Sequence, residues 1–186
     1  MGEVKKPLPV KLIMPMFSRH EALFQKAEQA LSERFGPTDY ASSRLPFDHT
    51  TYYEKEMGSD LERQFLSFER LIDPGSIASI KAMTNELEEQ WSRDGRRRIN
   101  LDPGYIAPSK LVLATTKNHG HRIYLGQGIY AEVTLIYREG DFRPLPWTYP
   151  DYRTEAYREI MRAIREIYMA QLTRLRGAGK LTRQLG

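Results

Sequence analysis

Two kinds of hydrophobic spacing alternate along the chain, and this alternation limits the architectures that the chain can adopt. Apolar residues recur every three or four positions in three segments, 18–35, 73–91 and 153–174, as they do in amphipathic helices. Short apolar or aromatic runs bounded by glycine or proline lie between them and are typical of strands. These runs occupy 10–14, 40–57, 63–71, 98–101 and 121–137. The run at 40–57 is interrupted around Pro46 and Asp48 and predicts two strands joined by a turn.

Residue types at the helix ends support these assignments. Ser18 and Glu21 have the spacing of a capping box, and Gly36 would end the first helix. Asp73 is expected to cap the second helix, with Pro74 at its first position. The apolar stripe of this second helix is interpreted as core rather than as a cofactor site.

The order of the elements predicts the fold class. Strand, helix, three strands, helix and strand suit an α+β fold with a mainly antiparallel sheet and helices on one face, broadly ferredoxin-like. A β-hairpin at 121–137, turning at 126–128, and a long C-terminal helix would be added to this core. We expect 1–176 to form a single domain and 177–186 to form a basic, flexible tail.

The segment 100–137 holds most of the reactive residue types, but its first part is ambiguous. Asp102-Pro103-Gly104 predicts a turn. Ser109 can cap a short helix through Lys117, although the apolar run at 111–113 would also suit a buried strand. We favour the helix by a small margin.

Composition excludes several kinds of chemistry. The chain has no cysteine, which removes disulfides, thiolate zinc sites and cysteine nucleophiles and fits a reducing cytosol. We see no secretion signal and no run long enough to span a membrane, so we expect a cytoplasmic protein without a membrane partner. The net charge of +4, from 28 basic and 24 acidic residues, is only mildly favourable to polyanions.

Lysine, arginine and hydroxyl side chains concentrate in the central segment and favour a phosphate site. Lys110, Thr115, Thr116, Lys117 and Arg122 are the residue types that bind phosphate, and a helix starting at Ser109 would add its N-terminus. Surface lysines and structural threonines are an equally good interpretation. Asp102 and Glu132 would bind a hydroxyl, a base or a metal.

Two histidines, His49 and His121, are the expected proton carriers if the protein is an enzyme. His49 and Thr51 match the His-x-Thr arrangement of two-histidine phosphoesterases, but the second copy has Ile123 in place of the hydroxyl residue. A metal site at His119 and His121, joined by His49, Asp102 or Glu132, is a further alternative. No cofactor is specified by these patterns.

The common nucleotide-binding signatures do not occur. The only P-loop fragment, at 177–182, follows a helix rather than a strand, and Thr116-Lys117-Asn118-His119 has histidine where guanine recognition requires aspartate. A Ras-type GTPase is therefore not expected. The aromatic sequence PWTYPDY, at 146–152, is interpreted as a packed strap in preference to a stacking platform.

Five segments of the chain resemble one known family. HTTYYEKEMG, NLDPGY, KLVLATTK, HRIYLGQGIYAEVTL and WTYPDY are similar to a bacterial domain-of-unknown-function family whose members are often labelled GTP-binding proteins. The resemblance is collinear over nearly the whole chain and brings no established activity with it. It implies that one site is surrounded by Asp102, Lys110, Lys117, His121, Arg122 and Glu132.

We therefore expect the protein to bind a phosphorylated small molecule, most simply a nucleotide, or a nucleic-acid fragment. Lys110, Lys117 and Arg122 would hold the phosphate. One alternative is a non-enzymatic RNA- or protein-binding module that uses the C-terminal helix and the arginines Arg96, Arg97 and Arg98. The phosphoesterase with a single intact His-x-Thr motif is the other alternative.

Overall fold

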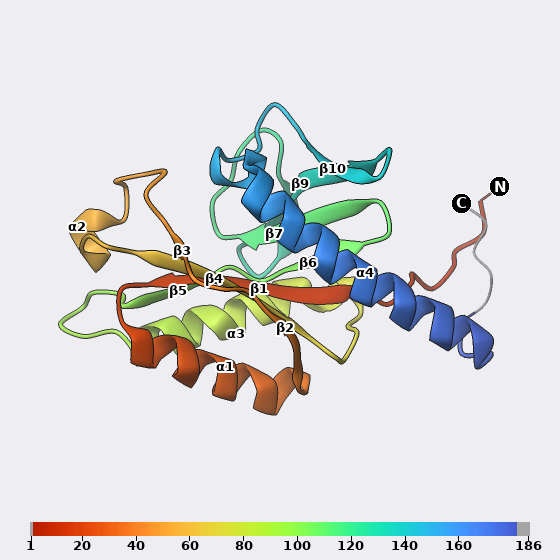
Figure 1. Cartoon of the computed structure of the whole chain (residues 1–186), viewed down its shortest axis with the longest axis horizontal. Coiled ribbons are helices and arrows are strands. Elements are labelled where there is room, and N and C mark those ends of the chain that lie inside the picture. Colours follow the sequence, from red (N-terminus) through yellow and green to blue (C-terminus); the bar gives the residue numbers. More distant parts are fainter. Residues whose placement is uncertain (1, 182–186) are drawn as a thin grey trace.

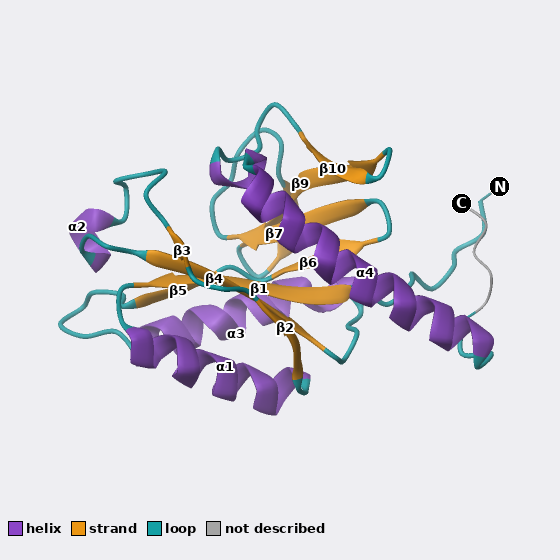
Figure 2. Ribbon diagram, in the orientation of Figure 1, coloured by secondary structure: helices purple, strands orange, loops and turns teal. Residues whose placement is uncertain are grey.

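A βαββαβ unit forms the first half of the protein (Figures 1 and 2). The structure is a computed structural model that describes residues 2–181. Four strands of the unit pair in the antiparallel order β5-β1-β4-β2, which is the ferredoxin-like order, so this part of the predicted fold is confirmed. The unit consists of β1 (Lys11–Ser18), α1 (Glu21–Phe35), β2 (Thr38–Ala41), β4 (Glu62–Phe68), α3 (Ile77–Gln90) and β5 (Ile99–Leu101).

The second half of the chain extends the same sheet and adds a helix. Strands β6 (Gly104–Ala107), β7 (Lys110–Thr115), β9 (Ile129–Arg138) and β10 (Asp141–Pro144) follow one another outward from β1. The predicted hairpin is confirmed, because β8 (Ile123–Gly126) pairs with β9. A second hairpin, which was not predicted, joins β9 to β10.

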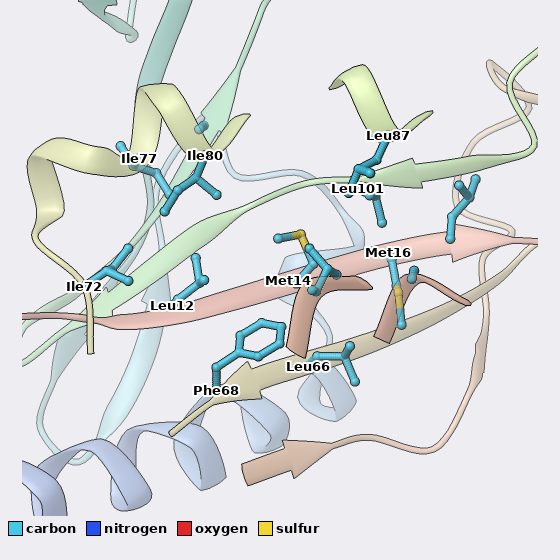
Figure 3. Close-up of a cluster of buried hydrophobic side chains, with 14 of the residues drawn as sticks. Leu12, Met14, Met16, Leu66, Phe68, Ile72, Ile77, Ile80, Leu87 and Leu101 are labelled. Atoms are coloured by element: carbon cyan, nitrogen blue, oxygen red, sulfur yellow. The ribbon is translucent and has the colours of Figure 1, made fainter. Parts of the chain in front are cut away.

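Helices cover both faces of the sheet, and the side chains of β1 alternate between the two faces. Leu12, Met14 and Met16 pack toward α1 and α3 (Figure 3), whereas Ile13 packs on the opposite face. The C-terminal helix α4 (Glu155–Gly177) lies against that opposite face through its long apolar stripe (Figure 1). The expected placement of helices on one face is thus correct for α1 and α3 and does not extend to α4.

Residues 102–104 do not form the predicted turn. Met16 pairs with Leu101 and Ile13 with Gly104 in one unbroken register, so β5 and β6 are nearly one strand along β1. Gly104 is required for a different reason. A Cβ atom there would lie 2.4 Å from the carbonyl oxygen of Val112, because the backbone of β7 passes so close.

The segment 110–117 contains a strand, so the helix that we favoured is wrong. Strand β7 is held between β6 and β9, and its apolar side chains are buried against both faces of the sheet. Periodicity could not separate these structures, and pairing on both sides decides between them. The helix N-terminus expected to attract an anion at Ser109 therefore does not exist.

Two other local predictions need correction. Ser18 does not cap α1; its hydroxyl donates to the carbonyl oxygen of Arg98, and α1 begins after His20 without a side-chain cap. The two strands expected within 40–57 do not pair with each other: β2 and the short β3 (Leu45–Pro46) both pair with β4, and α2 (Glu54–Met57) is one helical turn.

Of the tail predicted at 177–186, residues 182–186 lie outside the described residues. Two 3₁₀ turns, Pro74–Ser76 and Asp151–Arg153, precede α3 and α4. Among the described helices, none combines the length and the apolar character needed to cross a bilayer.

Candidate functional site

The candidate site lies where two strands separate. Pairing between β6 and β7 ends at Gly104 and Leu113, followed by one last hydrogen bond from the Ala114 amide to the Pro103 carbonyl. Beyond that point β7 leaves the edge of β5, and a cavity of about 830 Å³ opens between them. Its walls come from the loop at 47–53, α3, β5, the end of β7 and the segment 149–152.

Side chains of α3 occupy the free edge of β5. The Lys81 ammonium donates to the carbonyl oxygen of Leu101 at 2.7 Å, and the Leu101 amide donates to Glu88 Oε1 at 2.7 Å. Both side chains are buried, and their charged atoms are 3.8 Å apart. Burial raises the pKa of Glu88, while the nearby Lys81 ammonium opposes that rise. These contacts take the place of a neighbouring strand and keep β5 and β7 apart.

Arg97 joins the cavity wall to α2. Its guanidinium donates twice to the Glu56 carboxylate, at 2.7 Å each, and once to Asn100 Oδ1 at 2.9 Å. The hydrogen bond with Glu56 raises the pKa of Arg97 and lowers that of Glu56. The loop that carries α2 is thereby tied to β5 beside the cavity.

Lys117 differs from the other cations of the lining. Arg63, Lys81, Arg97 and Arg122 each have a carboxylate within 4.0 Å. Within residues 2–181, the Lys117 ammonium has no such carboxylate; it lies 4.4 Å from the ring centroid of Tyr52. Among the lysines and arginines of the lining, Lys117 is therefore the one without a carboxylate partner in the described part of the chain.

Glu132 organises its neighbours from a buried position. Its Oε2 atom accepts a hydrogen bond from Arg122 Nε at 2.9 Å and is 2.9 Å from Nε2 of His121. The imidazole of His121 stacks on Trp147 with 5.2 Å between centroids, and Arg122 also donates to the Tyr149 hydroxyl at 2.9 Å. Burial alone would lower the pKa of Arg122, but its bonds to Glu132 and Tyr149 raise it.

Most of the predicted site residues meet in this cavity. Those that line it are His49, Asp102, Thr116, Lys117, Arg122 and Glu132. His121 lies behind Glu132 rather than in the lining, and Lys110 lies exposed at the opposite end of β7. Lys110 lies apart from the other residues because 110–117 contains a strand and not the expected helix. Seven residues span about 23 Å in a strand but only about 10 Å in a helix.

The histidines do not form the expected pair. His49 is exposed in the loop at 47–53, which is not a strand, so strand alternation does not align it with Thr51. His119 and His121 stack on each other at 5.9 Å. In the part of the chain that the structure describes, no group of three or more histidines and carboxylates is arranged to hold a metal.

Sequence reasoning missed two residues of the inner wall, Arg63 and Asn100, and weighed a third, Tyr152, only as part of the aromatic segment 146–152. All three line the cavity and are almost fully buried, and within residues 2–181 each keeps one polar side-chain atom without a hydrogen-bond partner. Arg63 donates to Asp151 at 2.7 Å and lies 4.1 Å from the ring centroid of Phe47. For Arg63 and Asn100 the available signal was a polar residue inside a strand, which does not by itself indicate a site.

The arginine cluster is divided by the fold. Arg96 is exposed in a tight turn and pairs through its backbone with Arg93. Arg97 instead lines the cavity and is bound to Glu56. Arg96, Arg97 and Arg98 therefore do not present one common basic surface.

Comparison with known proteins identifies a family but no ligand. No curated protein and no solved structure matches the chain significantly. The model of one family, described as a domain of unknown function (DUF4416), matches residues 8–168. This match includes every element that lines the cavity. The chain therefore belongs to the DUF4416 family, whose function is not known.

Proposed function

We propose that the cavity between β5 and β7 binds a nucleotide or another phosphorylated small molecule. The observation that carries this proposal is Lys117, an ammonium at the cavity with aromatic neighbours and no carboxylate partner within the described chain. A lysine without a carboxylate partner can bind a phosphate without first breaking an ion pair. Arg122 adjoins Lys117, since its guanidinium donates to the Lys117 carbonyl at 2.9 Å, but its charge is balanced by Glu132.

The remaining lining fits a ligand that also carries a ring. Tyr52 and Tyr149 are exposed, and Tyr53 is partly buried beside them. Aromatic faces of this kind stack on planar bases. The cavity volume of about 830 Å³ lies in the range of small-molecule sites, about 300–1,000 Å³. A nucleotide would place its phosphate at Lys117 and its base against these rings.

GTP is one member of this class, and the proposed site would hold it differently from a P-loop protein. A P-loop surrounds phosphates with backbone amides at a helix N-terminus. Here the phosphate would meet side chains at the end of a strand. RNA binding through Arg96, Arg97 and Arg98 has less support, because Arg97 is engaged inside the cavity wall.

Ligand-induced stabilisation tests this proposal. The wild type and Lys117→Met are heated with ATP, GTP, their monophosphates or inorganic phosphate, and melting temperatures are compared. Lys110→Met is the matched control, since Lys110 is an exposed lysine at the start of β7, the strand that precedes Lys117, and lies outside the cavity. A ligand at 100 times its Kd stabilises the folded state by about 2.7 kcal/mol.

We expect stabilisation in the wild type and in Lys110→Met, and its loss in Lys117→Met with an unchanged circular dichroism spectrum. The Lys117 side chain is exposed, its ammonium lies beside the rings of Tyr52 and Tyr53, and its hydrogen bonds to Thr115 and Arg122 are made by the backbone, so its replacement should leave the fold intact. The proposal is wrong if none of these compounds stabilises the wild type. It is also wrong if Lys117→Met responds as strongly as the control.

A further inference from the structure

The amide of Asn100 is fixed in one orientation by its surroundings. Arg97 Nη1 donates to Asn100 Oδ1 at 2.9 Å, and a guanidinium can only donate, so the amide nitrogen must be the other end. That nitrogen is buried, has no hydrogen-bond partner among the described residues and belongs to a residue that lines the cavity. Asn100 therefore offers an unused donor to whatever occupies the cavity.

Asp102 offers the complementary group next to it. Asp102 continues the line of β5, with its amide bonded to the carbonyl of Pro15, so its side chain and that of Asn100 emerge on the same face. Its carboxylate has one distant partner, the Lys81 ammonium at 3.5 Å, and its side chain is 31% exposed. The wall thus carries an accessible carboxylate on the same face as the Asn100 amide, with the Lys81 ammonium 3.5 Å from that carboxylate.

We propose that this wall binds the vicinal diol of a sugar, so that the ligand is a phosphorylated ribose compound. This inference rests on the proposed function and specifies which part of the ligand enters this end of the cavity. Each hydroxyl of a diol both donates and accepts. Two adjacent hydroxyls can donate to both oxygens of Asp102 while one of them accepts from Asn100, and Lys81 keeps its bond to the Leu101 carbonyl.

A base edge can also bind this wall, because a carbonyl oxygen accepts from Asn100 while an adjacent N–H group donates to Asp102. Binding through a diol that all ribonucleotides share predicts no selection among the bases, whereas binding through a base edge predicts such selection. The position of Lys117 agrees with the diol. It follows the end of β7 across the cavity from β5, so a phosphate bound there and a diol bound at Asn100 would occupy opposite walls.

Titration calorimetry with matched ligands tests the diol. The ligands are the four common ribonucleoside 5′-monophosphates, their 2′,3′-dideoxy counterparts, ribose 5-phosphate and 2-deoxyribose 5-phosphate. The two sugar phosphates show whether the base is needed. Losing hydrogen bonds to a charged group weakens binding roughly 10- to 100-fold. We expect that difference between each diol ligand and its partner without the diol.

Asn100→Asp identifies the residue responsible. The new carboxylate still accepts from Arg97 but cannot donate, so the preference for the diol should fall at least about tenfold while binding of the dideoxy ligands changes little. Asn85→Asp is the matched control, because Asn85 lines the same cavity from α3 and receives the same change of charge. It should keep the preference.

Each result supports or overturns one claim. Equal affinity for the ribo and dideoxy ligands in the wild type overturns the diol and leaves the phosphate site standing, and this comparison needs no variant. A preference that survives in Asn100→Asp, or selection by base without dependence on the sugar, also overturns it. If no phosphorylated ligand binds the wild type, the proposed function fails together with this inference.

Discussion

The buried ion pair that holds the free edge of β5 makes a quantitative prediction. Lys81→Met removes the donor to the Leu101 carbonyl and leaves the buried Glu88 carboxylate with Arg97 Nη1, 3.5 Å away, as its remaining cation. Both side chains are nearly inaccessible, at 5% and 4% exposure. Breaking a buried pair from one side costs about 3–5 kcal/mol; because Arg97 remains beside Glu88, we expect a loss at the lower end, about 3 kcal/mol, in the free energy of unfolding at pH 8.

The cost should depend on pH in a definite direction. Burial already holds the pKa of Glu88 above its ordinary value of 4.5, and loss of Lys81 removes an opposing influence and raises it further. A group with a raised folded pKa contributes stability that is present below its unfolded pKa and is lost as pH rises through the folded value. Lys81→Met should therefore be less destabilising at pH 5 than at pH 8, by up to about 1.4 kcal/mol for each pH unit between the two pKa values.

Urea unfolding of three proteins at pH 5 and pH 8 measures this. The double variant Lys81→Met with Glu88→Gln keeps an acceptor for the Leu101 amide but carries no charge at positions 81 and 88. It should recover about 2 kcal/mol relative to the single variant at pH 8 and lose the pH dependence. The reasoning is refuted if Lys81→Met costs less than about 1 kcal/mol at pH 8, or costs the same at both pH values.

Two further perturbations follow from the structure. Gly104→Ala would press a methyl group onto the Val112 carbonyl, so we expect the free energy of unfolding, measured by thermal unfolding, to fall by about 1–3 kcal/mol. Gly120→Ala is the control and should change little, because the space around Gly120 is open. Equal effects of the two substitutions would contradict the close approach at Gly104. Arg97 holds the pKa of Glu56 below its ordinary 4.5, so the stability that Glu56 contributes is present above that value and is lost as pH falls through the folded pKa. The Glu56→Gln variant should therefore lose stability less steeply on acidification than the wild type. Identical acid unfolding profiles would show that the Arg97–Glu56 pair does not stabilise α2.

Local patterns in the sequence were sufficient for the regular elements of the fold. The helical spacing at 73–91 and 153–174 corresponds to α3 and α4, and the glycines at 126 and 128 turn the hairpin between β8 and β9. These signals depend on neighbours in the chain, since periodicity and turn conformation are local properties. The order of elements then specified the ferredoxin-like half, because few topologies accommodate it.

The conformation of segment 110–117 could not be decided from the local sequence alone. An apolar run such as Leu111 to Leu113 is compatible with a buried helix or a buried strand. Its conformation depends on β6 and β9, which approach it from both sides. Once it is a strand, Lys110 and Lys117 lie at opposite ends, and one phosphate site cannot contain both.

The sequence by itself determined that Asp102, Thr116, Lys117 and Arg122 were candidates, because reactive side chains can be recognised by type. Only the tertiary structure decided that β5 and β7 separate, that Lys81 and Glu88 satisfy the exposed edge, and that Asn100 faces the resulting space with an unused donor. The reason is physical: whether a polar atom finds a partner depends on contacts between residues far apart in the chain, and no local pattern contains that information.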